Sequence, residues 1–189
     1  MTSDLSLRRA LLVIVAVISL HSFVAAQQNG NRMAQIASAL RAGEYKQALQ
    51  LLKTALADSP ANSELWTMQG VAFKGVGNTK DALASFRHAI KLAPDDIPAL
   101  QGAAQIEFDR GNAAGIPLIE HLLRLRADDL TSHAMVAILE YQQGDCTSAL
   151  PHFEKALSLF EARPAGLRAY AACLVRLRQF DKAIVVLRR

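Results

Sequence analysis

Residues 63–96 read SELWTMQGVAFKGVGNTKDALASFRHAIKLAPDD, a stretch that divides into two apolar segments of about a dozen residues each. In both segments the apolar side chains recur with helical period, and Gly77-Asn78 interrupts the pattern between them. Glycine readily takes the left-handed conformation that ends a helix, and a following asparagine can cap the next helix. The stretch therefore predicts two helices joined by a tight turn, with a break at Pro94.

The same pattern returns along the chain at a fixed interval. The recurring alanines, at spacings of 34, 67 and 34 residues, are Ala48, Ala82, Ala149 and Ala183. The spacing of 67 accommodates two repeats, and Ile116 stands where the alanine between them is missing. A glycine precedes each of the first four positions: Gly43, Gly77, Gly111 and Gly144. A period of this length predicts stacked repeats rather than one globular core. We expect units over residues 29–62, 63–96, 97–129, 130–163 and 164–189, the last of them incomplete.

The repeat resembles the tetratricopeptide repeat (TPR), whose signature positions are almost all filled in residues 63–96. The matching residues are Trp66, Gly70, Phe73, Ala82, Phe86, Ala89 and Pro94. The resemblance implies an all-α fold over residues 29–189, a right-handed superhelical solenoid of antiparallel helix pairs. It also implies a scaffold that binds a protein or peptide in its concave groove, without catalysis and without a cofactor.

The resemblance further implies which residues line the groove, because in this family they come from fixed positions of each first helix. Carried onto this sequence, they are Glu64, Thr67, Met68, Val71, Lys74, Gln101, Gln105, Phe108, Asp109, Met135, Ile138, Tyr141, Gln142, Arg168, Ala172, Val175 and Arg176. The family's clamp for a terminal carboxylate needs lysine and asparagine where Thr67, Met68 and Val71 stand, so we expect no such clamp. The mixture of apolar and polar side chains, ending in two arginines, suits a peptide with apolar anchors and an acidic end. The alternative is that some of these residues pack between units.

Residues 1–26 have the pattern of a secretory signal peptide. Arg8-Arg9 precede an apolar stretch, and Val24-Ala25-Ala26 before Gln27 suits cleavage. The alternative is an uncleaved signal anchor, for which the uncharged residues 10–26 are short. We therefore expect a secreted or periplasmic protein, or a membrane-anchored one if residues 10–26 are retained.

The sequence favours neither nucleic-acid binding nor catalysis. The chain has a net charge of +4, and residues 161–189 alone carry +5. A basic end could contact an acidic partner, a membrane surface or nucleic acid, but we interpret it as a solvated helix face. An exported chain rarely meets nucleic acid, so we expect no such partner. Histidines are spread along the chain without ligand spacing, and we expect them on helix surfaces: His88, His121, His133 and His152. Nucleophile-elbow, phosphate-loop and zinc-protease motifs are absent from the sequence.

The two cysteines, Cys146 and Cys173, fall on neighbouring antiparallel helices at the same end of the stack. An exported protein meets oxidising conditions, and an even number of cysteines suits a disulfide. The alternative is two buried thiols that pack as small apolar residues.

The last unit stops inside its second helix, with no polar helix to cover its apolar edge. One interpretation is that the chain is the accessory portion of a longer exported enzyme or envelope assembly factor. The other is that the edge serves for self-association.

Overall fold

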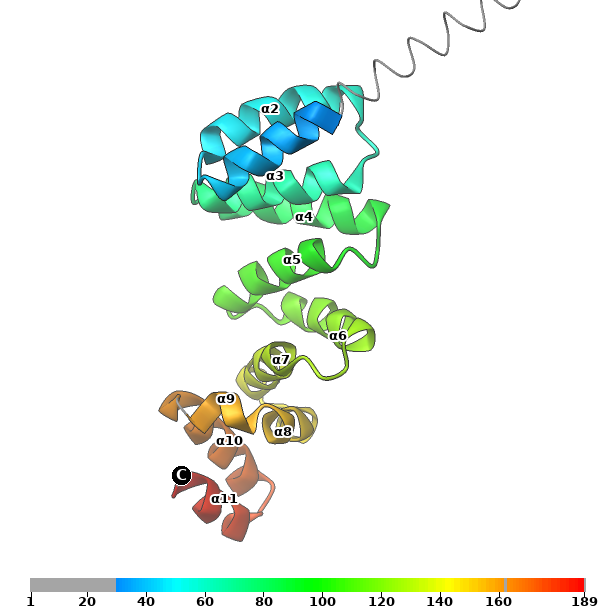
Figure 1. The fold of residues 1–189 in the computed structure, drawn as a ribbon. Coiled ribbons are helices and arrows are strands. Elements are labelled where there is room, and N and C mark those ends of the chain that lie inside the picture. The colour runs from blue at the N-terminus through cyan, green and yellow to red at the C-terminus, as the bar shows by residue number, and fades with distance from the viewer. Residues whose placement is uncertain (1–29, 162, 189) are drawn as a thin grey trace, which may run out of the picture. The chain divides into compact units, whose positions relative to one another are not determined.

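The computed structural model describes residues 30–161 and 163–188, and the expected signal segment lies outside these residues. The described chain is helical and divides into two compact units, one up to Ala61 and one from Asn62 onward (Figure 1). The predicted fold class, a TPR-like solenoid of helix pairs, is confirmed. None of the described helices combines the length and the apolar character that crossing a bilayer requires.

The first unit is one helix pair. A helix over residues 30–41 is followed, after the turn at Gly43, by α2 (Tyr45–Asp58). The two helices bury Ile36 and Leu52 completely, and an ion pair joins Arg32 to Asp58.

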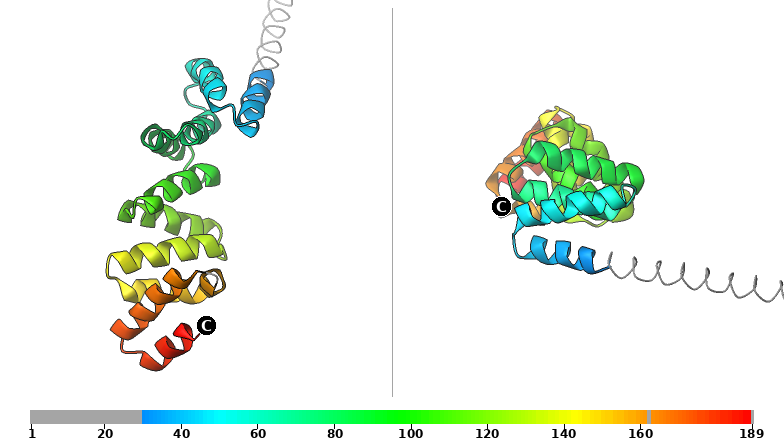
Figure 2. Two further views of the ribbon diagram at one scale, coloured as in Figure 1. Left: turned by 90° about the vertical axis from the view of Figure 1, so that its left-hand side faces the viewer. Right: turned by 90° about the horizontal axis from the view of Figure 1, so that it is seen from above.

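The second unit contains four further helix pairs, stacked one after another (Figure 2). Its elements are α3 (Ser63–Gly75), α4 (Thr79–Leu92), α5 (Ile97–Asp109), η1 (Ala113–Gly115), α6 (Ile116–Leu125), α7 (Leu130–Gln142), α8 (Cys146–Lys155), α9 (Leu157–Glu161), α10 (Pro164–Arg176) and α11 (Phe180–Leu187). The first helices of the pairs are α3, α5, α7 and α10. The second helix of the α7 pair is broken, since α8 ends at Lys155 and α9 resumes at Leu157.

Small residues let the helices of this unit approach closely around one aromatic ring. Phe86 of α4 is 1% exposed. A Cβ atom added to Gly70 would lie 2.6 Å from the Phe86 ring, and one added to Gly102 would lie 2.4 Å from it. The ring therefore fills the space between α3 of its own pair and α5 of the next. Any side chain in place of Gly70 or Gly102 would clash with this ring.

The turns inside the first four pairs place glycine in the left-handed region. Backbone φ angles are between 62° and 82° at Gly43, Gly77, Gly111 and Gly144. The residue after three of these glycines caps the following helix: the side chains of Asn78, Asn112 and Asp145 accept hydrogen bonds from backbone N–H groups. In the last pair Arg178 occupies the left-handed position, with a φ of 59°.

Replacing Arg178 by glycine is expected to raise the free energy of unfolding by up to about 1 kcal/mol, because a non-glycine residue is strained in this region. Arg178 is exposed, so the change removes little packing. Urea denaturation followed by circular dichroism would measure the gain. Gly144→Ala is the matched opposite change and should lower the stability. A loss of stability in Arg178→Gly would contradict the strain argument.

α11 presents an uncovered apolar surface. Phe180, Ile184, Val185 and Leu187 are each about half exposed or more. Self-association through this edge stays a prediction.

Candidate peptide-binding face

Two adjoining hollows lie on the second unit, between first helices of consecutive pairs. The larger, of about 480 Å³, is lined by residues of α5, α7, α9 and the start of α10: Gln105, Phe108, Thr131, Ala134, Met135, Ile138, Leu159, Phe160, Arg163, Ala165 and Gly166. The smaller, of about 200 Å³, is lined by Gln101, Ala104, Gln105, Leu122, Asp129, Thr131, Ser132 and Met135. The two hollows share Gln105, Thr131 and Met135. We call the surface formed by both hollows the α5–α7–α10 face.

The structure brings several of the predicted groove residues together on this face. Five of them line the hollows: Gln101, Gln105, Phe108, Met135 and Ile138. Tyr141 follows Ile138 by three residues and so lies on the same side of α7. The guanidinium carbon of Arg176 is 5.8 Å from the centre of the Tyr141 ring, a cation–π contact between α10 and α7.

Other predicted residues line neither hollow. Of these, the residues on α3 are Glu64, Met68, Val71 and Lys74, and those on the later helices are Asp109, Gln142, Arg168, Ala172 and Val175. Thr67 is only 7% exposed, and its hydroxyl donates a hydrogen bond to the Asp96 carboxylate at 2.7 Å, with the Ser63 carbonyl as a more distant acceptor at 3.2 Å. The prediction that Thr67 lines an open groove is therefore wrong, because its side chain is engaged inside its own repeat.

The wall that comes from α9 and the start of α10 is not among the predicted groove positions. Those positions all belong to first helices, whereas Leu159 and Phe160 follow the break in a second helix. Phe160 packs against Gly166, where an added Cβ would lie 2.0 Å from its ring. Gly166, close after Pro164, is the sequence feature that could have indicated this wall. A glycine within a helix marks a place where a bulky side chain can approach the helix backbone.

Hydrogen bonds inside the chain engage the acidic side chains near the hollows. Asp129 caps α7, accepting from the Thr131 amide and from the Ser132 hydroxyl at 2.6 Å. Gln105 donates to Asp109 at 2.7 Å. The face therefore offers apolar side chains and amides, with Arg163 as the charged group in its larger hollow.

A disulfide joins α8 to α10. Cys146 and Cys173 are bonded, with Cα atoms 5.0 Å apart, and both residues are buried. The bond connects the fourth helix pair to the fifth, and so holds α10 in its place beside α7.

The histidine positions differ in part from expectation. His133 is buried, and its Nδ1 lies 2.7 Å from Nδ1 of His152. The prediction of a surface residue is wrong for His133, because α7 and α8 pack face to face there. No group of three or more histidine, cysteine or acidic side chains within residues 30–161 and 163–188 is arranged to hold a metal ion.

Two buried glutamates occupy the same position in consecutive repeats but have different surroundings. Glu107 on α5 accepts hydrogen bonds from Arg87 at 2.6 Å and from Asn112 at 2.8 Å. One repeat later, Glu140 on α7 has Asp145 in place of the asparagine, and its Oε2 is buried without a hydrogen-bond partner among the described residues. Burial, with repulsion from Asp145 and Glu120, raises the pKa of Glu140 to about 7.

The variant Glu140→Gln is therefore expected to be more stable than the wild type at high pH. A raised pKa means that the folded state holds the proton longer than the unfolded state, so stability falls as pH rises from 4.5 to about 7. The difference in free energy of unfolding between the variant and the wild type should grow over this range. At pH values above 7 it should reach up to about 3 kcal/mol. Urea denaturation of both proteins between pH 4.5 and 8.5 measures this difference.

Glu107→Gln is the matched control for this series. This substitution removes the charge of the carboxylate that is ion-paired with Arg87. It should therefore lower the stability, whereas Glu140→Gln raises it. A difference in free energy of unfolding between wild type and Glu140→Gln that stays constant across the pH range would contradict a raised pKa of Glu140.

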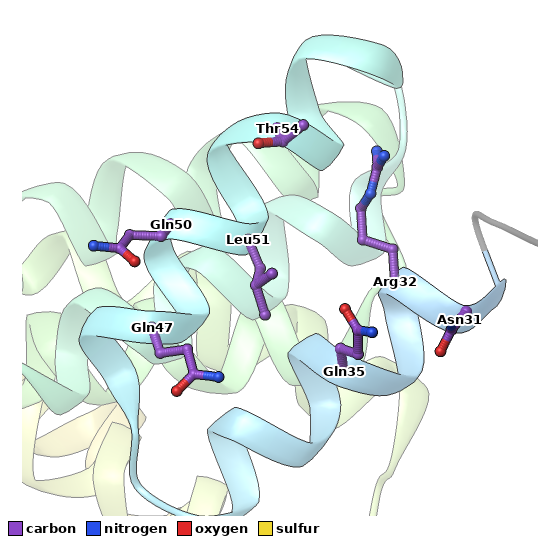
Figure 3. Close-up of a pocket in the computed structure, with 7 residues that line it drawn as sticks. All are labelled: Asn31, Arg32, Gln35, Gln47, Gln50, Leu51 and Thr54. Atoms are coloured by element: carbon purple, nitrogen blue, oxygen red, sulfur yellow. The ribbon is translucent and has the colours of Figure 1, made fainter.

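The first unit carries a larger but polar and open groove of about 830 Å³, shown in Figure 3. Its lining residues are Asn31, Arg32, Gln35, Gln47, Gln50, Leu51 and Thr54. In the next repeat the equivalent positions are closed by a ring contact between Trp66 and His88 at 4.1 Å and by a hydrogen bond from Ser85 to Gln69. With Leu51 as its one aliphatic side chain, this groove offers little apolar surface to anchor a partner, unlike the α5–α7–α10 face.

Stacked helix pairs, glycine turns and a hollowed face of first helices define a TPR scaffold of the kind that mediates protein–protein interaction. The chain belongs to the family described as the cytochrome c-type biogenesis protein H TPR domain, whose model matches residues 25–166.

Comparisons with individual proteins agree with this fold. Superkiller complex protein 3 of Homo sapiens is 35% identical over 149 residues, which are 73% of this chain and 9% of that protein. Protein CTR9 homolog of Arabidopsis thaliana is 26% identical over 119 residues, 62% of this chain and 8% of that protein. The chain thus matches under a tenth of the length of these relatives. A crystal structure of MamA superposes with a TM-score of 0.72 at 16% identity, covering 85% of this chain and 88% of MamA. At that identity the likeness concerns the fold alone.

Proposed function

We propose that this chain is an exported TPR scaffold that binds a protein or peptide on the α5–α7–α10 face and performs no catalysis itself. The observation that carries this proposal is the larger hollow, where Phe108, Met135 and Ile138 from two consecutive first helices face one space of about 480 Å³. Concave, mainly apolar surfaces with a few polar groups are where proteins bind the anchoring side chains of partners.

The family suggests where the partner is to be sought. Its model carries the name of a cytochrome c-type biogenesis protein. We therefore propose that the partner is a polypeptide of that process, presented as an extended or helical segment.

The proposed organisation of the chain follows the repeats. Residues 1–26 act as a signal peptide that exports the chain, and residues 29–189 form the TPR domain. The charge pattern and small residues before Gln27 support export. Sequencing the N-terminus of the mature protein tests it, because a start at Gln27 is expected and an intact N-terminus would identify an anchor.

The binding proposal is tested by affinity capture from the exported fraction. The double variant Met135→Glu with Tyr141→Ala puts a charge into both hollows and removes the ring beneath Arg176. We expect it to lose the cytochrome c-biogenesis proteins that the wild type recovers, measured by quantitative mass spectrometry.

The matched control is Ala84→Glu, which adds a charge at an exposed position of α4 outside both hollows. It should recover the same proteins as the wild type. Recovery that is unchanged in the Met135→Glu, Tyr141→Ala variant would show that the partner binds elsewhere.

A further inference from the structure

Two of the helices that border the larger hollow, α7 and α10, carry only positive charge at their exposed positions, whereas the exposed carboxylates of Asp109 and Glu161 lie on α5 and α9. The exposed charged side chains of α7 and α10, both fully described, are Arg168 and Arg176. Glu140, the carboxylate on these two helices, is buried on α7. Arg163, directly before α10, adds a third exposed guanidinium and lines the hollow itself.

Within residues 30–161 and 163–188, neither Arg163 nor Arg176 forms an ion pair. The ion pairs of the described residues involve Arg32, Arg87, His121 and Lys182, and none of them includes Arg163 or Arg176. Arg176 instead lies over the Tyr141 ring. A guanidinium held over an aromatic ring keeps its N–H donors at the ring edge for a carboxylate.

The two arginines and the apolar hollow are arranged along the direction of α7 and α10. Ala134, Met135 and Ile138 line the hollow, and Tyr141 continues the same side of α7 toward its C-terminal end. Arg163 stands at the N-terminal end of α10 and Arg176 at its C-terminal end, about 20 Å apart along the helix. A bound segment lying along α7 would thus meet a cation in the hollow and another beyond it.

We propose that the segment bound on the α5–α7–α10 face is acidic, with an apolar side chain in the larger hollow and carboxylates against Arg163 and Arg176. This inference rests on the proposed function and adds the chemistry of the partner. Asp109 and Asp129 keep their negative charge while they accept hydrogen bonds within the chain, so the carboxylates of the segment are expected on the α10 side of the face and not on the α5 side. Charge complementarity of this kind selects partners and speeds their association.

The test selects partners without assuming their sequence. Random dodecapeptides displayed on phage are selected on the full chain, and enriched peptides are synthesised and titrated by fluorescence polarisation. We expect enrichment of peptides that combine large apolar residues with aspartate or glutamate. Their affinity should weaken as salt is raised, because exposed charges are screened.

Charge reversal then assigns the contacts. Arg163→Glu with Arg176→Glu should weaken the acidic peptides about tenfold or more. Peptides with lysine in place of their acidic residues should bind this variant better than they bind the wild type. Arg124→Glu on α6, outside both hollows, should leave binding unchanged. Arg163→Gln with Arg176→Gln replaces the reversal pair if the latter unfolds, as judged by circular dichroism.

The outcomes separate this inference from the proposed function. If enriched peptides are basic or uncharged, and Ile138→Glu abolishes their binding, the acidic segment is refuted while the binding face stands. If no peptide is enriched, or if enriched peptides bind Ile138→Glu as well as the wild type, both proposals fail. Acidic peptides that are indifferent to both arginine variants would also overturn the inference.

Discussion

Replacing Phe86 by alanine is expected to lower the free energy of unfolding by about 4 kcal/mol. The ring is 1% exposed, and it lies against the backbones of Gly70 and Gly102. Because glycine has no side chain to move into the vacated space, the cavity stays open. The free energy of unfolding therefore falls by the full amount expected for an unfilled cavity. Urea denaturation of the full chain, followed by circular dichroism at 222 nm, measures the loss.

Two further variants make the prediction specific to this packing. Phe180→Ala removes the same side chain from a position that is 55% exposed, and it should cost less than about 1 kcal/mol. Adding Gly102→Ala to Phe86→Ala should restore part of the lost stability, although Gly102→Ala alone should destabilise by overpacking. If Phe86→Ala costs no more than Phe180→Ala, the ring does not hold the second and third repeats together.

Opening the disulfide is expected to lower the stability by about 3–4 kcal/mol. The bond closes a loop with a sequence separation of 27 residues, and the estimate follows from the entropy that this closure removes from the unfolded chain. Thermal unfolding with and without a phosphine reductant should show a clearly lower midpoint for the reduced protein. Hydrogen exchange should locate the loosening in α8, α10 and α11, because the bond ties the last two helix pairs together.

The double variant Cys146→Ala with Cys173→Ala is the control for this experiment. It should unfold at the same midpoint with and without reductant, near that of the reduced wild type. A wild-type midpoint that does not respond to reductant, while mass spectrometry shows both thiols free, would contradict a stabilising role for the bond.

The repeat architecture could be predicted from sequence because its determinants are local and recur in phase. Gly77 followed by Asn78 specifies a helix end and a helix start, and the structure has a positive φ at the first residue and a capping side chain at the second. Such signals depend on a few adjacent residues, and repetition at a fixed interval removes the ambiguity of any single copy.

The candidate site was predicted only in part, since it depends on contacts between repeats. Phe108, Met135 and Ile138 were expected on the groove and line the larger hollow. Arg163 was not predicted, because it is the N-cap residue of α10 and so stands outside the first-helix positions expected to line the groove. Thr67 occupies a groove position in sequence, yet its hydroxyl finds a carboxylate partner 29 residues away. Periodicity does not encode that kind of pairing.

Glu140 illustrates a second limit of sequence reasoning. It recurs at the position of Glu107, so the periodic pattern treats the two glutamates alike. Their difference comes from their neighbours: Glu107 accepts hydrogen bonds from Arg87 and Asn112, whereas Glu140 lies near Asp145 and Glu120, whose carboxylates cannot donate. The amide of Ser148 holds the pKa of Asp145 below its ordinary value, which keeps a negative charge beside the buried carboxyl.

Site-specific photocrosslinking in cells tests the central claim, partner binding on the α5–α7–α10 face, most directly. A benzoylphenylalanine residue is introduced at Ile138, inside the larger hollow, and in a second protein at Lys80, on the exposed start of α4. If the partner binds on this face, covalent adducts with a second polypeptide form from position 138 and none form from position 80. Adducts from position 80 alone, or equal adducts from both positions, would contradict it.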